Sequence, residues 1–326
     1  MISIIIPHYN RSDIINETLL SISNQTSSNY ECIVVDDGSD NIHYCEVERL
    51  IKSHDNIIFI KRTGKLKGAN SCRNQGARLA KGNYVMFLDS DDLLDPFCIE
   101  KRLEATIIHQ EMDMIIFKMG RFKSDIKEYN NVVNRFLKET STSNLLKNFL
   151  SFNLPWQLTA ALWKKDFFKE IQFDEKLSRF QDVEVNIHAL SKTDKIKYYP
   201  HQEIDSYYRE STYHVSASLK QLRVVFDNGI YLINKWSPRL PAEDKICLTG
   251  ILLFISNRYC DIISYRDTRE LKRIYYELGN QNSKNWNAWF AVSLSLKNFN
   301  RIPFIGYFRN RFYFFGKKPY VRNDQL

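Results

Sequence analysis

Glycine is scarce in this chain of 326 residues, which contains only 11. A Gly-rich linker or a repeat array is therefore a poor fit. No two of the six cysteines form a Cys-x-x-Cys pair, which excludes a zinc ribbon and a dithiol redox motif. Unpaired cysteines in apolar surroundings are typical of free thiols in a reducing compartment, so we expect a cytoplasmic protein.

The chain also lacks a long apolar run. Its longest strongly apolar stretch, residues 246–255, is too short to cross a bilayer. Residues 1–7 lack the basic segment of a signal peptide. These features predict a protein that is soluble or that binds peripherally to the inner face of the membrane.

Several nucleotide and hydrolase motifs are missing. We find no GxGxxG, no GxxxxGK[ST], no HExxH and no GxSxG. Their absence argues against a dinucleotide site, a P-loop, a zinc protease and a serine hydrolase.

Positive charge is concentrated at one end of the chain. The net charge is +8, and residues 297–326 hold seven basic residues against one aspartate, which accounts for +6 of it. The remainder is nearly neutral. Binding of nucleic acid through a basic surface of the fold is therefore not expected.

The first 120 residues alternate short β-branched runs with helical patterns. The predicted strands are 2–6, 31–36, 57–60, 84–89 and 114–118, and Ser12 or Asp13 is placed to cap the first helix. This alternation predicts an α/β fold: a Rossmann-like, mostly parallel sheet with helices on both faces. From about residue 216 onward the pattern is helical, which predicts an α-helical C-terminal extension.

Polar clusters follow three of the predicted strands. They are Pro7-His-Tyr-Asn10, Asp36-Asp-Gly-Ser39 and Asp89-Ser-Asp-Asp92. Ligands of open α/β sheets bind beyond the carboxyl ends of the strands. Carboxylates brought together there repel one another, so the pattern indicates a divalent cation at this edge.

These segments, together with Arg73-Asn-Gln-Gly76, resemble the family 2 glycosyltransferases with a GT-A fold. The resemblance covers about residues 1–215, which it implies form a catalytic domain. Residues 1–120 would be its nucleotide-sugar half and 121–215 its acceptor half, with 216–326 as a separate helical region. The family mostly transfers sugars with inversion from nucleotide diphosphate donors, most often UDP-linked, using Mn²⁺ or Mg²⁺.

The resemblance also implies roles for single residues. Pro7 and Tyr9 would line the base pocket, and Asp37 would accept a hydrogen bond from the base. Asp89 and Ser90 would contact the ribose. The Asp-x-Asp motif would bind the metal through Asp91 with Asp89, and Asp92 would act through water.

Arg73 has two possible partners. It is a candidate contact for the donor phosphate or ribose, and the alternative is a salt bridge to one of the aspartates.

Asp182 is the candidate catalytic base. It opens a predicted helix over 182–190, where the helix N-terminus would favour its charged form. The alternatives are that Asp182 only caps the helix, or that Glu184 is the base. The family commonly has Glu-Asp at this point, and this chain has Gln181-Asp182.

Three further residues are weaker candidates. Trp156 would stack on an acceptor sugar or pack in the core. Arg209 or His214 would touch the diphosphate or the metal. The alternative for His214 is that it is a surface histidine with no role in the site.

The C-terminal region carries no catalytic motif. Within 299–318, basic residues interleave with eight aromatic ones, which suits an anionic membrane surface or an ordinary packing helix. The helices before this tail would pack on the catalytic domain or pair chains in a homo-oligomer.

The expected function is that of an inverting, metal-dependent glycosyltransferase of surface polysaccharide biosynthesis. It would move a sugar from a nucleotide-sugar donor to a glycan or lipid-linked acceptor by single displacement. A nucleotidyltransferase and a non-catalytic module that binds sugar nucleotides or glycans are the alternatives.

Overall fold

The structure is a computed structural model. It describes residues 1–52, 54–123, 131–132, 141–199, 203–210, 218–258 and 264–279. The expected contacts of His214 and the basic aromatic tail at 299–318 lie outside these residues.

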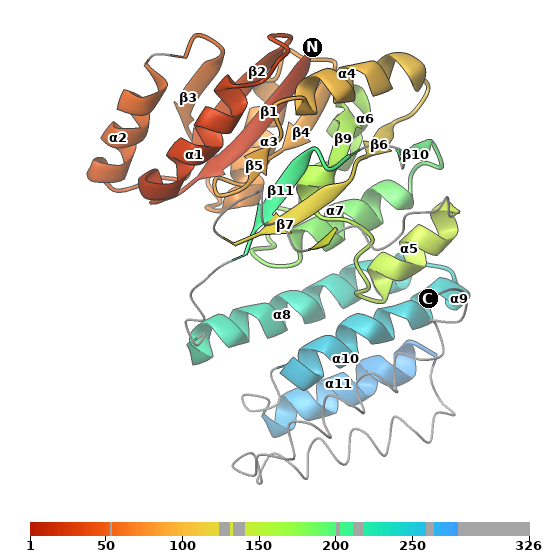
Figure 1. Ribbon diagram of the computed structural model, residues 1–326. Coiled ribbons are helices and arrows are strands. Elements are labelled where there is room, and N and C mark those ends of the chain that lie inside the picture. The colour runs from red at the N-terminus through yellow and green to blue at the C-terminus, as the bar shows by residue number, and fades with distance from the viewer. Residues whose placement is uncertain are drawn as a thin grey trace. The chain divides into compact units, whose positions relative to one another are not determined.

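A seven-stranded sheet in the order β10-β6-β9-β4-β1-β2-β3 forms the centre of the first part of the chain (Figure 1). Its strands are β1 (Ile2–His8), β2 (Tyr30–Asp36), β3 (Ile57–Lys61), β4 (Tyr84–Phe87), β6 (Met114–Ile116), β9 (Ala161–Lys164) and β10 (Ile196–Tyr198). Only β9 runs antiparallel to its neighbours, β4 and β6. The predicted α/β class with a mostly parallel sheet is confirmed, whereas the antiparallel β9 is not expected from the sequence.

Alternate residues of β1 face two different layers of helices. Ile2, Ile4 and Ile6 join one buried cluster with apolar side chains of α1 (Ser12–Ser23), α2 (Asn41–Ile51) and α4 (Cys98–Ile108). On the opposite face, Ile5 meets α3 (Ala69–Leu79) at Gly76. This two-residue period explains why a continuous β-branched run forms a strand that is buried on both sides.

The N-terminus of α1 differs from the prediction. Its N-cap residue is Arg11, and no side chain caps the helix, so neither Ser12 nor Asp13 has that role. Strand β1 also continues two residues beyond the predicted end, through Pro7 and His8.

A second, four-stranded sheet has the order β5-β11-β7-β8. It consists of β5 (Leu93–Leu94), β7 (Met119–Phe122), β8 (Asn131–Val132) and β11 (Ser206–Arg209). Arg102 of α4 and Asp205, just before β11, form an ion pair with Nε 2.7 Å from Oδ2, and both side chains are fully buried. This pair fixes the start of β11, whose far end carries Arg209.

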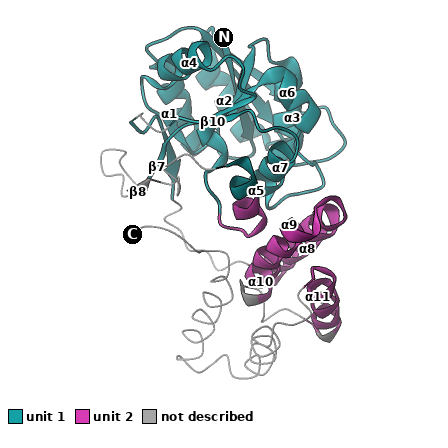
Figure 2. Ribbon diagram, turned by 90° about the vertical axis from the view of Figure 1, so that its right-hand side faces the viewer, with its two compact units in different colours: residues 1–146, 154–214 teal, residues 147–153, 215–326 magenta. Residues whose placement is uncertain are grey.

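The chain divides into two compact units, residues 1–146 with 154–214 and residues 147–153 with 215–326 (Figure 2). The remaining helices are α5 (Thr142–Leu150), α6 (Lys165–Ile171), α7 (Gln181–Leu190), α8 (Leu219–Trp236), α9 (Ala242–Lys245), α10 (Thr249–Arg258) and α11 (Tyr265–Glu277). In the second unit α10 packs against α8 and α11, and Arg223 Nη1 lies 2.8 Å from Asp267 Oδ2.

Among the described residues, no helix combines the length and apolar character that crossing a membrane requires.

Candidate active site

The carboxyl ends of β1, β2 and β4 meet at one edge of the main sheet. His8 stands opposite Asp36 in the parallel register of β1 and β2, and Ile5 stands opposite Phe87 of β4. The loops that follow these strands therefore lie side by side. They contain the three polar clusters identified in the sequence.

Asp36 points into the protein and not toward this edge. Its Oδ2 accepts hydrogen bonds from the backbone N–H groups of Gly38 and Ser39, each at 3.0 Å. Its Oδ1 lies 3.2 Å from His8 Nδ1. Burial opposes the charge of Asp36, but the hydrogen bonds from Ser39, His8 and Gly38 outweigh it and lower the pKa. Asp36 therefore holds the loop after β2 in place. The next residue, Asp37, is the candidate for ligand contacts.

His8 completes this buried arrangement. Its Nε2 accepts the backbone N–H of Arg11 at 3.3 Å, so Nδ1 carries the ring proton and donates to Asp36. Burial lowers the pKa of His8, in agreement with a neutral ring. The pair ties the loop after β1 to the loop after β2.

Tyr9, directly after β1, is exposed, whereas Asp37, directly after β2, is buried. The Tyr9 side chain is half exposed, and Lys67 Nζ lies 5.0 Å from its ring centroid. Asp37 Oδ1 accepts a hydrogen bond from Arg62 Nε at 2.5 Å. Pro7 is buried within β1 just before Tyr9. The assignment of Pro7, Tyr9 and Asp37 to a base pocket stays a prediction.

Arg73 forms the salt bridge that was the alternative to a donor contact. Its Nη2 lies 2.5 Å from Asp89 Oδ1; the Arg73 side chain is 4% exposed and that of Asp89 is 43% exposed. Arg73 Nη1 also reaches Asn70 Oδ1 at 3.3 Å and Gln181 Oε1 at 3.5 Å. One guanidinium thus joins the Asp-x-Asp motif to the first residue of α7.

Asp91 is the second carboxylate of that motif. Its Oδ2 lies 3.1 Å from Arg11 Nη1, and both side chains are partly exposed. Burial raises the pKa of Asp91, and the nearby charge of Asp89 raises it further. Two carboxylates that repel each other in this way favour a cation between them.

Asp89 and Asp91 fit the ligand set of Mg²⁺ or Mn²⁺. These ions bind through one or two carboxylates together with phosphate oxygens and water. In the part of the chain that the structure describes, no group of three or more His, Cys, Asp or Glu side chains forms a metal cage.

The structure places Asp92 in a buried position. It accepts hydrogen bonds from Thr159 Oγ1 at 3.3 Å and from the backbone N–H of Arg209 at 3.1 Å. Burial raises its pKa well above the ordinary range, and Asp89 and Asp91 add to the shift. Asp92 thus anchors β11 at Arg209, and its expected action through water stays a prediction.

Arg209 lies at the carboxylate cluster. Its Nε donates to the Asp91 carbonyl oxygen at 2.8 Å, and its Nη2 lies 2.6 Å from Glu17 Oε2. The Arg209 side chain thus lies beside Asp91, the candidate metal ligand. A contact from Arg209 to a diphosphate remains a prediction.

Asp182 is partly buried in the first turn of α7. Burial raises its pKa, although the backbone N–H of Val183 and the charge of Arg73 act in the opposite direction. Burial thus opposes the charged form that the helix N-terminus is expected to favour. A carboxylate with a raised pKa is a stronger base, which suits the predicted role. Glu184, the alternative base, is 1% exposed.

Trp156 does not face an acceptor. Its side chain is fully buried, and Nε1 donates to Asn186 Oδ1 at 3.0 Å. The core-packing alternative is correct. The sequence pattern of an aromatic pair at 156 and 163 cannot distinguish a core tryptophan from a sugar platform.

Two arginines at the site, Arg11 and Arg62, are not among the residues predicted from the sequence. Arg11 follows the first polar cluster and pairs with Asp91, and Arg62 follows β3 and pairs with Asp37. Both stand directly after a predicted strand end or its polar cluster, so basic residues at these places are a signal for the site, as the carboxylates are.

The sequence is similar to those of known glycosyltransferases. The chain is 30% identical over 200 residues to a poly(ribitol-phosphate) beta-glucosyltransferase of Bacillus spizizenii, a match covering 60% of this chain and 30% of the relative. It is 32% identical over 151 residues to the Escherichia coli enzyme UDP-Glc:alpha-D-GlcNAc-diphosphoundecaprenol beta-1,3-glucosyltransferase WfgD, covering 45% and 56%. The chain thus spans about a third to somewhat over half the length of these relatives.

A solved structure shares the whole fold. The crystal structure of S. aureus TarS 1-349 in complex with UDP aligns with 100% of this chain and 94% of that one, at a TM-score of 0.62 and 19% identity. The family model described as glycosyl transferase family 2 matches residues 3–168, which is just over half of the chain. The chain belongs to glycosyl transferase family 2.

Proposed function

We propose that this protein transfers a sugar from a UDP-sugar to a hydroxyl group of a glycan or lipid-linked acceptor, with inversion at the anomeric carbon. One observation carries the proposal. Arg73 contacts both Asp89, in the Asp-x-Asp motif, and Gln181, the neighbour of the candidate base Asp182. A donor-binding carboxylate and a proton acceptor are thereby held at one place, which a single displacement requires.

The donor nucleotide would occupy the loops after β1 and β2. The half-exposed ring of Tyr9 offers a face for stacking the base. Asp37 is buried and paired with Arg62, and an imide N–H of the base would reach the carboxylate of this pair. Uracil has such an N–H. The E. coli relative and the TarS complex, whose names include UDP-Glc and UDP, support uracil as the base.

The leaving diphosphate would lie against Asp89, Asp91 and nearby cations. Asp89 and Asp91 are the residues that would hold Mn²⁺ or Mg²⁺, which supplies positive charge where the leaving group becomes negative. Arg11 and Arg209 lie beside Asp91 and bring further positive charge to the same place. Arg73 holds the Asp89 carboxylate in position.

The acceptor hydroxyl would give its proton to Asp182. The new bond forms between the acceptor oxygen and the anomeric carbon as the bond from that carbon to the diphosphate oxygen breaks. The raised pKa of Asp182 brings its basicity closer to neutral pH, where a general base acts best.

Thermal unfolding with UDP, GDP, CDP and dTDP, each with and without Mn²⁺, tests the donor site. A ligand at about 100 times its dissociation constant stabilises a fold by about 2.7 kcal/mol. We expect an Mn²⁺-dependent rise in Tm with UDP that is lost in Asp91→Asn. Exposed Asp166, at the other edge of the sheet, provides the control variant Asp166→Asn, which should keep the rise.

Two other results would contradict the proposal. A rise with UDP but no sugar transfer to any acceptor would favour a binding module. Release of pyrophosphate from UTP and a sugar phosphate would indicate a nucleotidyltransferase.

A further inference from the structure

The main sheet has an open edge at β3. This strand comes last in the sheet and pairs with β2 in a parallel register without a bulge. Directly after the strand, the Arg62 N–H group donates to the Asp36 carbonyl oxygen of β2 at 2.8 Å. Backbone groups of successive residues in a strand point to alternate sides. Those of Ile57, Phe59 and Lys61, each an odd number of positions from Arg62, therefore point away from β2.

Part of this edge is satisfied within the chain. The Ile57 N–H group donates to the His54 carbonyl oxygen at 3.1 Å, and the Lys61 carbonyl oxygen accepts a hydrogen bond from Gln75 Nε2 at 2.9 Å. Among the described residues, no group hydrogen-bonds the rest of the edge, which is the N–H and C=O of Phe59, the C=O of Ile57 and the N–H of Lys61. Free groups on an edge strand are a template for another strand.

The free groups are complementary to those of a second copy of the chain. A two-fold axis at Phe59 would pair two β3 strands antiparallel. Phe59 would then stand opposite Phe59 of the other copy, as a pair that exchanges both N–H···O=C bonds. Lys61 would stand opposite Ile57 of the other copy and donate its N–H to the Ile57 carbonyl oxygen. Every free group is used in this register, and the two groups left over are those that already have partners within the chain.

The side chains of β3 suit the same register. Ile58 is 42% exposed and Ile60 is partly exposed. Each would stand opposite the other across the two-fold axis, in a non-hydrogen-bonded pair whose side chains lie close together. Residues 57–60 carry no charge and no proline, the features that commonly keep an edge strand from pairing.

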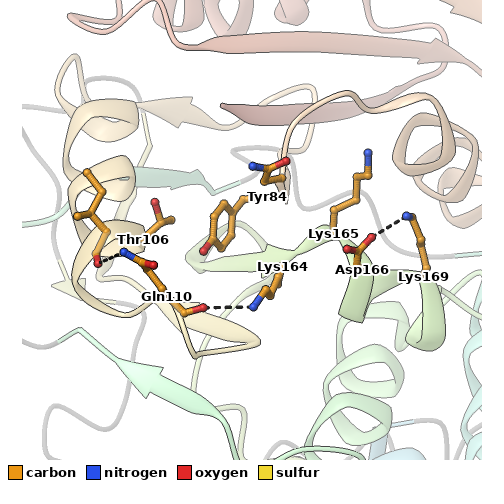
Figure 3. A pocket seen from close by; sticks show the side chains of 9 residues that line it. Tyr84, Thr106, Gln110, Lys164, Lys165, Asp166 and Lys169 are labelled. Carbon is orange, nitrogen blue, oxygen red and sulfur yellow. Dashed lines mark hydrogen bonds and ion pairs between the residues drawn. The ribbon is translucent and has the colours of Figure 1, made fainter.

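Other places along the sheet are protected or satisfied. The strand at the opposite edge, β10, has only three residues, with Lys197 in the middle. A cavity of about 520 Å³ lies where β4 begins and β9 ends, and its lysines turn apart (Figure 3). Lys164 Nζ donates to the Gln110 carbonyl oxygen at 3.2 Å. Lys165 Nζ donates to the Ala80 carbonyl oxygen at 2.8 Å, on the other face of the sheet. The edge at β3 differs in presenting free groups in a self-complementary order.

We propose that β3 is the interface of a homodimer. Two copies pair their β3 strands antiparallel about Phe59, so that one sheet continues through both. A second copy is the partner because its own edge supplies each donor opposite a free acceptor, and places Ile58 against Ile60. This inference does not depend on the proposed transferase activity.

Sedimentation velocity of the full chain over a range of concentrations tests the proposal, and we expect a dimer. Ile58→Lys should weaken dimerisation by about tenfold or more, because the two introduced ammonium groups would lie diagonally across the axis and repel each other. Ile107→Lys makes the same change on α4, where the isoleucine is 69% exposed, and should dimerise like the wild type. Circular dichroism melting establishes that both variants are folded.

Disulfide trapping tests the register. Residue 58 would stand opposite residue 60 of the other copy, with the two Cα atoms about 4.5 Å apart, which a disulfide can span. A mixture of Ile58→Cys and Ile60→Cys should therefore form a covalent dimer with oxidised glutathione. Either variant alone should give only the background of the wild type, which carries the exposed Cys45.

A monomer at every concentration would overturn the proposal. A dimer that Ile58→Lys leaves intact would also overturn it, because the copies would then meet through another surface. A mixture of the cysteine variants that cross-links no more than each variant alone would reject the register about Phe59.

Discussion

His8 Nδ1 lies 3.2 Å from Asp36 Oδ1, and this contact joins the ends of the two strands that carry Tyr9 and Asp37. The ring is neutral because Nε2 accepts the backbone N–H of Arg11. A second proton on the ring would break that hydrogen bond and place a charge in a buried position. The native state therefore binds a proton at His8 less readily than the unfolded chain does.

The first prediction is that stability falls as the pH drops below about 6.5, the ordinary pKa of histidine. Because burial lowers the pKa of folded His8, the unfolded state binds more protons in this range. The loss continues until the pH passes the lowered pKa of the folded state. Urea unfolding at pH 7.5, 6.5 and about 5.5 measures this slope. A His8→Gln variant with the same slope as the wild type would contradict the assignment.

The second prediction concerns the base. Asp182→Asn should lower kcat by about 10²- to 10⁴-fold, because an amide cannot accept the proton of the acceptor hydroxyl. Binding of UDP with Mn²⁺ should be unchanged. Asp194→Asn, on an exposed turn after α7, is the matched control in kinetics and in nucleotide titration. Equal loss of transfer and of donor binding in Asp182→Asn would reject its role as the base.

The third prediction concerns Arg73 and the pH profile. The charge of Arg73 lowers the pKa of Asp182, so Arg73→Gln should raise it. The acid limb of the plot of kcat against pH, where Asp182 becomes protonated, should then move to higher pH. Arg73→Lys keeps the positive charge, so its acid limb should lie at the same pH as that of the wild type. A limb that stays in place in the glutamine variant would show that Arg73 and Asp182 are not coupled.

The fourth prediction concerns the contact that holds α3 on the sheet. A Cβ at Gly76 would lie 2.5 Å from Ile5 Cγ2. Crowding of this kind costs about 1–3 kcal/mol, and the better helix propensity of alanine offsets up to about 1 kcal/mol. Gly76→Ala should therefore lower the free energy of unfolding. The pair Gly76→Ala/Ile5→Leu, which removes the Cγ2 branch, should recover part of the loss in urea titrations, and no recovery would point to a different cause.

The strands and their polar ends were predictable because both signals are local. The β-branched run 2–6, followed by Pro7-His-Tyr-Asn10, marks a buried strand, which the structure extends to His8. Strand β9 was not predicted, because its four residues follow an irregular segment. No pattern in the neighbouring sequence indicates that they enter the sheet between β4 and β6. Register and neighbour order depend on contacts between distant parts of the chain.

The limits of prediction at the site have the same origin. Asp91 and Asp92 are adjacent in sequence, yet Asp91 is partly exposed beside Arg11 whereas Asp92 is buried under the backbone of Arg209. Residue 209 lies 117 positions away from Asp92, and no pattern around Asp92 indicates it. Charge and spacing identified the cluster, and only the fold decides which carboxylate faces the ligand.

The position of β9 has a consequence for synthesis and folding. Strand β4 is complete by residue 87, but its neighbour β9 begins only at residue 161. Until the ribosome has added those later residues, one side of β4 exposes unpaired N–H and C=O groups and can pair with other chains. Fragments that end before residue 161 should aggregate, and the nascent chain should require chaperones over this interval. The two halves inferred from the sequence, 1–120 and 121–215, therefore share one sheet, because β9 lies between β4 and β6.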